Sequence, residues 1–211
     1  MNRYQFLILI IFAASLSAFK INNSPKPVRV THLSALAVTY KVDEQNSKVT
    51  WLAKKVTGEH AGNVKVSAGS LILDNNALKG GSFQIDTRSI SVTDLTDPEA
   101  NGKLLGHLKS DDFFGVEKYP AANFVITSVK STGAGKYDVT GKLTIKGITN
   151  PVTFPAVVKT EGNKVQADAR ITVDRTKYGI KFRSKNFFEN LGDKTIADDF
   201  ELNVALTANK Q

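Results

Sequence analysis

The amino-acid sequence predicts an all-β protein whose strands close into an antiparallel barrel or pack as a sandwich. Apolar and polar residues alternate with a period of two from about residue 40 onward, which is typical of strands that are wet on one face. Turn residues divide this pattern into at least eight strands, and a single helical pattern interrupts it. A closed barrel would also remove the exposed edges of the sheet.

Each predicted strand contributes one apolar face to the interior. In chain order these faces comprise Val49, Trp51 and Ala53; Val64, Val66, Ala68, Ser70 and Ile72; Phe83 and Ile85; Ala122, Phe124, Ile126 and Ser128; Tyr137, Val139, Gly141, Leu143 and Ile145; Val152, Phe154, Ala156 and Val158; Val165, Ala167, Ala169, Ile171 and Val173; and Phe200, Leu202, Val204 and Leu206. Turns are predicted at residues 74–76, 133–135, 147, 150–151 and 161–163, which are rich in glycine, asparagine and proline.

One segment breaks the alternation and predicts a short helix over residues 96–109. Asp97 is a suitable N-cap, Pro98 fits the first helical position, and Glu99 puts an acid in the first turn. The face that this helix would bury comprises Leu104, Leu105 and Leu108. We expect the helix to cap one end of the barrel or to form part of a pocket wall.

The predicted interior mixes large residues with small ones, and this leaves two interpretations open. Small residues on the inward faces favour a hollow barrel that holds one ligand. Alternatively, they lie opposite bulky partners and the core is dense. The small residues are Ala68, Ser70, Ala122, Gly141, Ala156, Ala167 and Ala169.

The N-terminal residues predict export. Arg3 precedes a continuous apolar run at residues 6–12, which has the length of a signal-peptide core and is shorter than the roughly 20 residues of a spanning helix. Small residues at 15–17 and at 35–37 both fit a cleavage site, and an uncleaved anchor is the competing interpretation. We expect a periplasmic protein, with secretion as the alternative. The predicted division is a signal peptide at residues 1–18, with cleavage as late as residue 37 left open, a linker at 19–38 and a barrel domain at 39–209.

Composition and charge exclude several classes of protein. The chain has no cysteine, which rules out disulfides, thiolate metal sites and a cysteine nucleophile. The formal net charge of +8 falls to +4 without residues 1–37, because these carry four basic residues and no acid. The remaining charges are interspersed, so no basic stripe with aromatic residues predicts binding to nucleic acid.

No sequence motif predicts catalysis, a metal site or a cofactor. The histidines His32, His60 and His107 have no metal-ligand spacing, and nucleophile-elbow, Walker and dinucleotide-binding motifs are absent. Adjacent residues of an extended segment face opposite ways, so the acid pairs at 111–112 and 198–199 are interpreted as surface carboxylates. We therefore expect a protein that is not an enzyme, has no metal site and needs no cofactor besides a bound lipid or isoprenoid.

Three basic residues, Lys181, Arg183 and Lys185, alternate after Gly179 and would share one face near a barrel mouth. This arrangement fits recognition of an anionic headgroup, such as a phosphate or a carboxylate. A solvated charged face is the alternative interpretation.

Several ordered stretches stand out beyond the alternation. They are YKVD at residues 40–43 followed by Ser47, Val49 and Trp51, HLKSDDFFGVEKYP at 107–120, KGITNPVTF at 146–154 and DRTKYG at 174–179. Together they resemble the YceI-like lipid-binding, or polyisoprenoid-binding, family over about residues 39–208. The tail FFENLGDKTIADDFEL at 187–202 resembles the form common in Bacteroidetes-type members.

The resemblance implies a lipocalin-like eight-stranded antiparallel β-barrel with a short helical insertion. Family members look like exported binders of polyisoprenoids, isoprenoid quinones or fatty-acid-type lipids, and no catalytic residue carries over. We expect this chain to carry or store such an amphiphile in its interior. The expected lipid-binding residues are Trp51, Phe83, Ile85, Leu104, Leu105, Leu108, Phe113, Phe114, Phe124, Tyr178 and Phe182, with Lys181, Arg183 and Lys185 at the headgroup.

Two other functions stay open at this point. An enzyme that modifies a bound isoprenoid would need a buried carboxylate or histidine, and the predicted inward faces contain none. A solidly packed interaction or stress-response protein would hold no lipid, and Phe113, Phe114 and Tyr119 would then pack the helix onto the barrel. The expected partner is an apolar lipid or isoprenoid and not nucleic acid. A homodimer and transient contact with a membrane are both left open, although no heptad or apolar stripe supports a dimer.

Overall fold

The computed structural model describes residues 37–211. The predicted signal peptide, and the predicted linker except its last two residues, lie outside the described residues. Within the described residues, nine β-strands form one antiparallel sheet. They are β1 Val38–Val42, β2 Lys48–Lys55, β3 Gly58–Asp74, β4 Ala77–Val92, β5 Ala121–Gly133, β6 Lys136–Ile145, β7 Ile148–Glu161, β8 Lys164–Asp174 and β9 Ile196–Lys210.

The strands β1 and β2 together occupy one position in the barrel wall. Both lie between β3 and β9, with β2 paired to the earlier part of each strand and β1 to the later part. Between β1 and β2 the chain makes a turn, in which the Asp43 carboxylate accepts hydrogen bonds from the N–H groups of Gln45 and Asn46 at 3.2 and 3.1 Å. From β2 the sheet continues through β9, β8, β7, β6 and β5 to β4, and pairing of β4 with β3 closes it into a barrel. The predicted eight-stranded antiparallel barrel is therefore confirmed.

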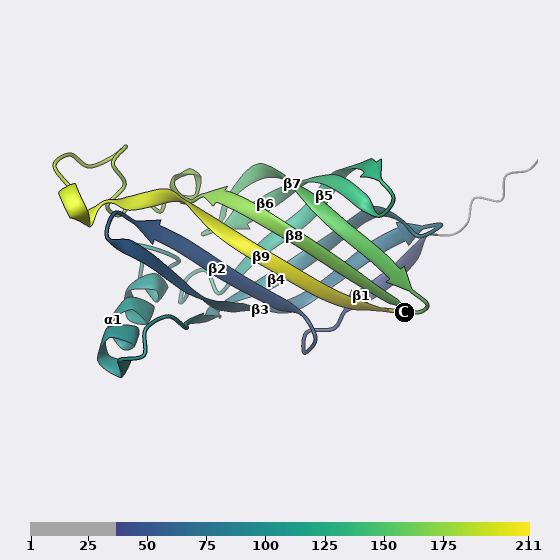
Figure 1. Ribbon diagram of the computed structural model, residues 1–211, viewed down its shortest axis with the longest axis horizontal. Helices are drawn as coiled ribbons and strands as arrows, with labels where there is room; N and C mark the ends of the chain where they lie inside the picture. The colour runs from purple at the N-terminus through teal and green to yellow at the C-terminus, as the bar shows by residue number, and fades with distance from the viewer. Residues whose placement is uncertain (1–36) are drawn as a thin grey trace, which may run out of the picture. The chain divides into compact units, whose positions relative to one another are not determined.

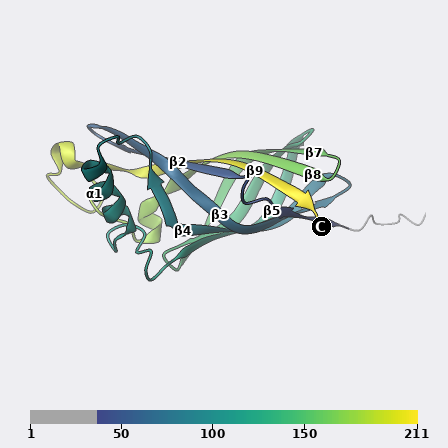
Figure 2. The ribbon, with the colours of Figure 1, turned by 90° about the horizontal axis from the view of Figure 1, so that it is seen from below.

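The predicted helix is also confirmed, as α1 (Pro98–Lys109). The Asp97 carboxylate accepts a hydrogen bond from the N–H of Ala100 at 2.8 Å and so caps the first turn. Leu108 is buried, and the other two leucines of its face are half-buried against the core. Figures 1 and 2 show α1 at the end of the barrel opposite the C-terminus. We call the end at α1 the helix end and the end at the C-terminus the closed end.

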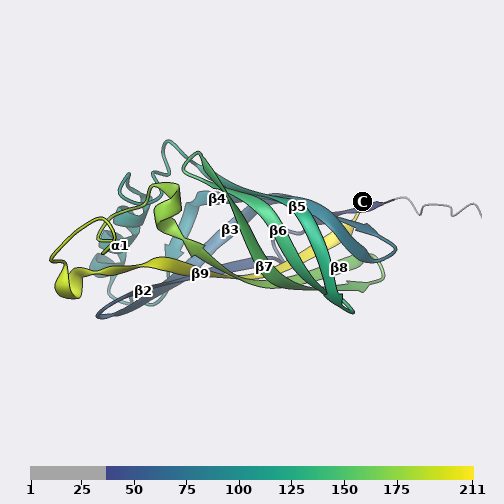
Figure 3. The ribbon, with the colours of Figure 1, turned by 90° about the horizontal axis from the view of Figure 1, so that it is seen from above.

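The connection between β8 and β9 lies at the helix end as well (Figure 3). It contains two short 3-10 helices, η1 (Arg175–Tyr178) and η2 (Gly192–Lys194). Among the residues that the structure describes, no helix has both the length and the apolar character needed to cross a membrane.

One predicted strand face is wrong in its second half. The register of β3 shifts before Ala68, so Leu71 and Leu73 point into the interior and are 2% and 1% exposed. Ala68 and Ile72, which the alternation placed inside, are exposed instead. A β-bulge adds one residue to a strand and moves every later side chain to the opposite face. The turn predicted at residues 150–151 is wrong too, because both residues lie in β7 and pair with β6.

The closed end of the barrel is densely packed by the strands themselves. Leu73 is 1% exposed, and Val165 and Ala208 are fully buried. The phenol oxygen of Tyr137 accepts a hydrogen bond from the buried N–H of Leu78 at 3.3 Å, so this polar atom has a partner. No separate segment is needed to seal this end.

Candidate functional site: two adjoining apolar cavities

The barrel interior contains two cavities. The inner cavity has a volume of about 100 Å³ and receives residues from all eight positions of the barrel wall. The helix-end cavity has a volume of about 120 Å³ and is lined partly by Leu108 of α1 and by Phe113 and Phe114, which follow that helix. The one carboxylate residue at the inner cavity, Asp168, is exposed on β8 and also borders a groove on the outer surface. The interior that a ligand would meet is therefore almost entirely apolar.

Four aliphatic residues border both cavities and mark the boundary between them. They are Val49 of β2, Ile85 of β4, Leu143 of β6 and Leu202 of β9. Because the same four side chains line both cavities, the two cavities adjoin each other inside the barrel.

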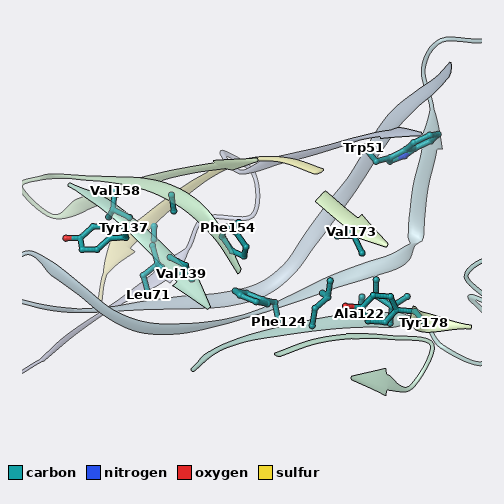
Figure 4. Packing of buried hydrophobic residues seen from close by; sticks show 14 of the residues in the cluster. Trp51, Leu71, Ala122, Phe124, Tyr137, Val139, Phe154, Val158, Val173 and Tyr178 are labelled. Carbon is teal, nitrogen blue, oxygen red and sulfur yellow. The ribbon is translucent and has the colours of Figure 1, made fainter. Parts of the chain in front are cut away.

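Three aromatic residues of the wall lie against glycines of neighbouring strands. A Cβ atom on Gly62 would come within 2.7 Å of the Trp51 ring, and one on Gly69 would come within 2.7 Å of the Phe83 ring. A Cβ atom on Gly141 would clash with the Phe124 ring. These glycines make room for large rings beside the cavities. Figure 4 shows Phe124 and Phe154 in the middle of the interior, with Tyr137 on one side of them and Trp51 on the other.

Seven of the eleven predicted lipid-binding residues line the two cavities. Phe83 and Phe124 border the inner cavity, and Ile85 borders both. Four border the helix-end cavity, namely Trp51, Leu108, Phe113 and Phe114. The remaining four, Leu104, Leu105, Tyr178 and Phe182, line neither cavity and pack in the surrounding core. Contact of any of these residues with a ligand stays a prediction.

An aromatic cluster holds the chain after α1 against the barrel. The His107 ring lies edge-on to Phe113 and Phe182, with ring centroids 4.9 and 4.6 Å apart, and its Nε2 lies 3.0 Å from Asp112 Oδ2. The Lys146 ammonium donates a hydrogen bond to the backbone carbonyl of Asp111 at 2.6 Å. Only the carboxylate of Asp112 has a side-chain partner in this cluster, and both acids are exposed, which agrees with their interpretation as surface carboxylates.

Arg175 is a wall residue of the helix-end cavity that the sequence did not single out. Its guanidinium donates hydrogen bonds to the carbonyls of Ile180, Ile196 and Ala197 at 2.8, 3.1 and 2.9 Å, and to Asp198 at 3.4 Å. Burial lowers the pKa of Arg175, and the nearby carboxylates of Asp198 and then Asp174 oppose this effect. Arg175 thus ties the β8–β9 connection to the barrel.

The DRTKYG motif explains how this arginine is placed. Asp174 accepts hydrogen bonds from the N–H and hydroxyl of Thr176 at 2.9 and 2.6 Å, which starts η1. Gly179 ends η1 with a φ of 75°, a left-handed conformation that suits glycine. Burial, with a smaller contribution from Asp174, raises the pKa of the Tyr178 phenol. The motif is therefore the sequence signal that could have pointed to Arg175.

The predicted alternation of Lys181, Arg183 and Lys185 does not form. The segment makes turns and not a strand, and Arg183 has a φ of 51°. All three residues are exposed, and none borders either cavity. Lys181 Nζ lies 4.5 Å from the centre of the Phe187 ring. The predicted alignment of these residues on one strand face is therefore wrong, and their recognition of an anionic headgroup near a barrel mouth stays a prediction.

The helix-end cavity also includes residues outside the predicted strand faces. Ile180 lies in the irregular β8–β9 connection, and Ile196 and Ala197 are the first two residues of β9. Outside a strand or helix, sequence spacing does not tell which side chains face the interior.

Comparison with known proteins places this barrel in a family. A model of the YceI-like domain matches residues 40–208. The chain belongs to the YceI-like domain family. A UPF0312 protein of Pseudomonas putida strain W619 is 33% identical over 156 residues, which cover 70% of this chain and 79% of the relative. A UPF0312 protein of Photorhabdus laumondii is 31% identical over 186 residues, which cover 81% and 87%.

Solved structures share the YceI-like fold. The crystal structure of Burkholderia cenocepacia BcnA has a TM-score of 0.64 and 27% identity, and the match covers 80% of this chain and 99% of BcnA. A polyisoprenoid binding domain from Saccharophagus degradans has a TM-score of 0.60 and 12% identity, with 82% and 99% covered. These matches support the closed barrel with one short helix.

Proposed function

We propose that this YceI-like protein binds a slender apolar ligand inside its barrel and carries or stores it. The observation that carries the proposal is the pair of adjoining cavities, which are lined almost entirely by aliphatic and aromatic side chains. Burying an apolar chain there needs no charged contact, because each buried CH₂ group contributes about 0.8 kcal/mol. A packed barrel that holds no ligand is the alternative, and it predicts that these cavities bind nothing.

The size of the cavities favours a chain over a bulky molecule. An apolar cavity of about 150 Å³ can hold a molecule the size of benzene. Cavities of about 100 and 120 Å³ that share four aliphatic lining residues suit consecutive parts of one flexible chain. Polyisoprenoids, isoprenoid quinones and fatty-acid-type lipids meet this requirement. The structural neighbour from Saccharophagus degradans is described as a polyisoprenoid binding domain, which supports the same class.

We also propose that the protein acts by binding and not by catalysis. The cavity walls contribute no imidazole and no inward carboxylate that could act as acid or base. The guanidinium of Arg175 is occupied by backbone carbonyls and by Asp198. The apolar run at residues 6–12 supports export, so we propose a role in the periplasm, or outside the cell if the protein is secreted.

A cavity-filling variant tests the proposal. Ala169 lines the inner cavity, so Ala169→Leu should weaken binding of cis-parinaryl alcohol, a slender, uncharged fluorescent polyene, by about tenfold, which is about 1.4 kcal/mol. Ala205→Leu is the matched control, because Ala205 is exposed on the adjacent strand β9. Probe binding measured by fluorescence titration should be unchanged in the control. Equal affinity in both variants, or no binding by the unmodified protein, would contradict the proposal.

A further inference from the structure

A short segment at the helix end presents two exposed aromatic rings to solvent. We call residues 180–195, which connect η1 to β9, the aromatic loop. Phe187 and Phe188 are 48% and 49% exposed. The other exposed large hydrophobic residues in residues 37–211 are aliphatic, and Figures 1 and 3 show the loop projecting beyond the strands. Two adjacent exposed rings on a projecting loop are accessible for contact with a partner.

The fold itself holds these rings outward. The backbone N–H groups of Phe187 and Phe188 both donate to the carbonyl of Ser184 at 3.0 Å, and Ser184 is fully buried. The N–H of Ile196 donates to the carbonyl of Arg183 at 3.0 Å and closes the base of the loop. The Asn186 amide donates to Asp198 at 2.6 Å. The exposed rings therefore lie at the tip of an anchored turn.

The aromatic loop carries a net positive charge, and one cation lies beside an exposed ring. The aromatic loop contains four basic residues and two acidic ones, Glu189 and Asp193. Lys181 Nζ lies 4.5 Å from the centre of the Phe187 ring, and the Arg183 guanidinium lies 5.0 Å from the centre of the Phe182 ring. Net positive charge on a loop with exposed aromatic rings matches an interface that is apolar at depth and anionic at its surface.

The aromatic loop is continuous with the cavity wall and with further apolar surface. Ile180 begins the loop and Ile196 follows it, and both line the helix-end cavity. At the β2–β3 turn, the N–H of Val56 donates to the carbonyl of Thr195 at 3.2 Å, and the Val56 side chain is 63% exposed. A partner surface that bound the aromatic loop would therefore also lie beside the helix-end cavity.

We propose that the aromatic loop docks on the surface of a lipid bilayer that contains anionic lipids. Phe187 and Phe188 enter the headgroup region, while Lys181, Arg183 and Lys185 contact phosphate groups. Such contact is reversible, because it combines a small apolar area with a few charges. The inference goes beyond ligand binding in the cavities and does not depend on it.

Vesicle flotation with the purified protein tests this docking surface. We expect flotation with vesicles that mix phosphatidylglycerol and phosphatidylcholine, and a loss of roughly tenfold in affinity with pure phosphatidylcholine or at high salt. Phe187→Ser with Phe188→Ser should reduce binding to the anionic vesicles by about tenfold or more. Val125→Ser with Val157→Ser is the matched control, since both residues are exposed on the barrel wall, at 48% and 37%. The control should float like the unmodified protein.

A second variant keeps the test decisive if the first one misfolds. Lys181→Gln, Arg183→Gln and Lys185→Gln together should remove the salt dependence and the preference for anionic vesicles. Failure of the unmodified protein to float, or equal flotation of loop variants and control, would overturn the proposal. A dimer in sedimentation equilibrium that the phenylalanine variant abolishes, without flotation, would overturn it in favour of a second copy. Titration of the same variants with cis-parinaryl alcohol separates the two proposals, because loop variants should keep full probe affinity whether or not they float.

Discussion

The two ends of the barrel are closed in different ways. At the closed end, the strands seal the interior with their own side chains, and Leu73, Val165 and Ala208 are at most 1% exposed. At the helix end, segments outside the sheet provide the cover, namely α1, the turn that follows it and the β8–β9 connection. The helix-end cavity borders these added segments. Opening the helix end would break no strand pairing, so the proposed ligand binding predicts entry at this end.

The largest effect that tests this difference between the two ends comes from replacing one buried leucine at each end with alanine. Leu73→Ala should lower the free energy of unfolding by about 4 kcal/mol, since it leaves a new cavity in a dense region. Leu108→Ala should cost about 2 kcal/mol, because Leu108 already borders empty space and part of its environment is adjustable. Urea unfolding monitored by circular dichroism measures both values. A larger loss for Leu108→Ala than for Leu73→Ala would show that the helix end is the rigid one.

A smaller effect concerns Tyr178, which lies under the β8–β9 connection. Its pKa is raised above the ordinary 10.0 by burial, so the folded state holds this proton when the unfolded chain has lost it. Its contribution to stability is complete below pH 10 and is lost as the pH rises toward the folded-state pKa. Tyr178→Phe should change the free energy of unfolding by less than about 1 kcal/mol at pH 7, because no protein group bonds the hydroxyl.

Between pH 9 and 11.5, we expect the Tyr178→Phe protein to lose less stability than the unmodified protein. The other buried tyrosines are present in both, so the difference isolates Tyr178. Tyr119→Phe, at a half-buried ring, is the control. Parallel stability curves for the unmodified protein and Tyr178→Phe across this range would contradict the assignment.

The strands could be predicted where the sheet is regular. In β6 all five predicted inward residues, from Tyr137 to Ile145, are buried, because no bulge interrupts the period of two. In β3 a bulge before Ala68 reversed the faces, and nothing in the local spacing marks it. In the segment after Gly179, basic and uncharged residues alternate, but the chain makes turns. The basic side chains are solvated in a strand or in a turn, so their alternation does not indicate which one forms.

The interior could be predicted only in part. Small inward residues suggested free space, and Ala156, Ala167 and Ala169 do border the inner cavity. Gly141 was counted with them, but the Phe124 ring of the neighbouring strand fills the place of its side chain. Whether a small residue leaves space depends on the ring that lies across from it, and this depends on strand register. Sequence spacing alone therefore could not separate a hollow barrel from a dense one.

Native mass spectrometry of the protein purified from its own host without detergent tests the central claim most directly. We predict a mass excess of a few hundred daltons that disappears on organic extraction, with an isoprenoid or acyl lipid in the extract. A bare polypeptide mass that stays unchanged after incubation with quinones, polyprenols and fatty acids would contradict the claim that the barrel binds an apolar ligand.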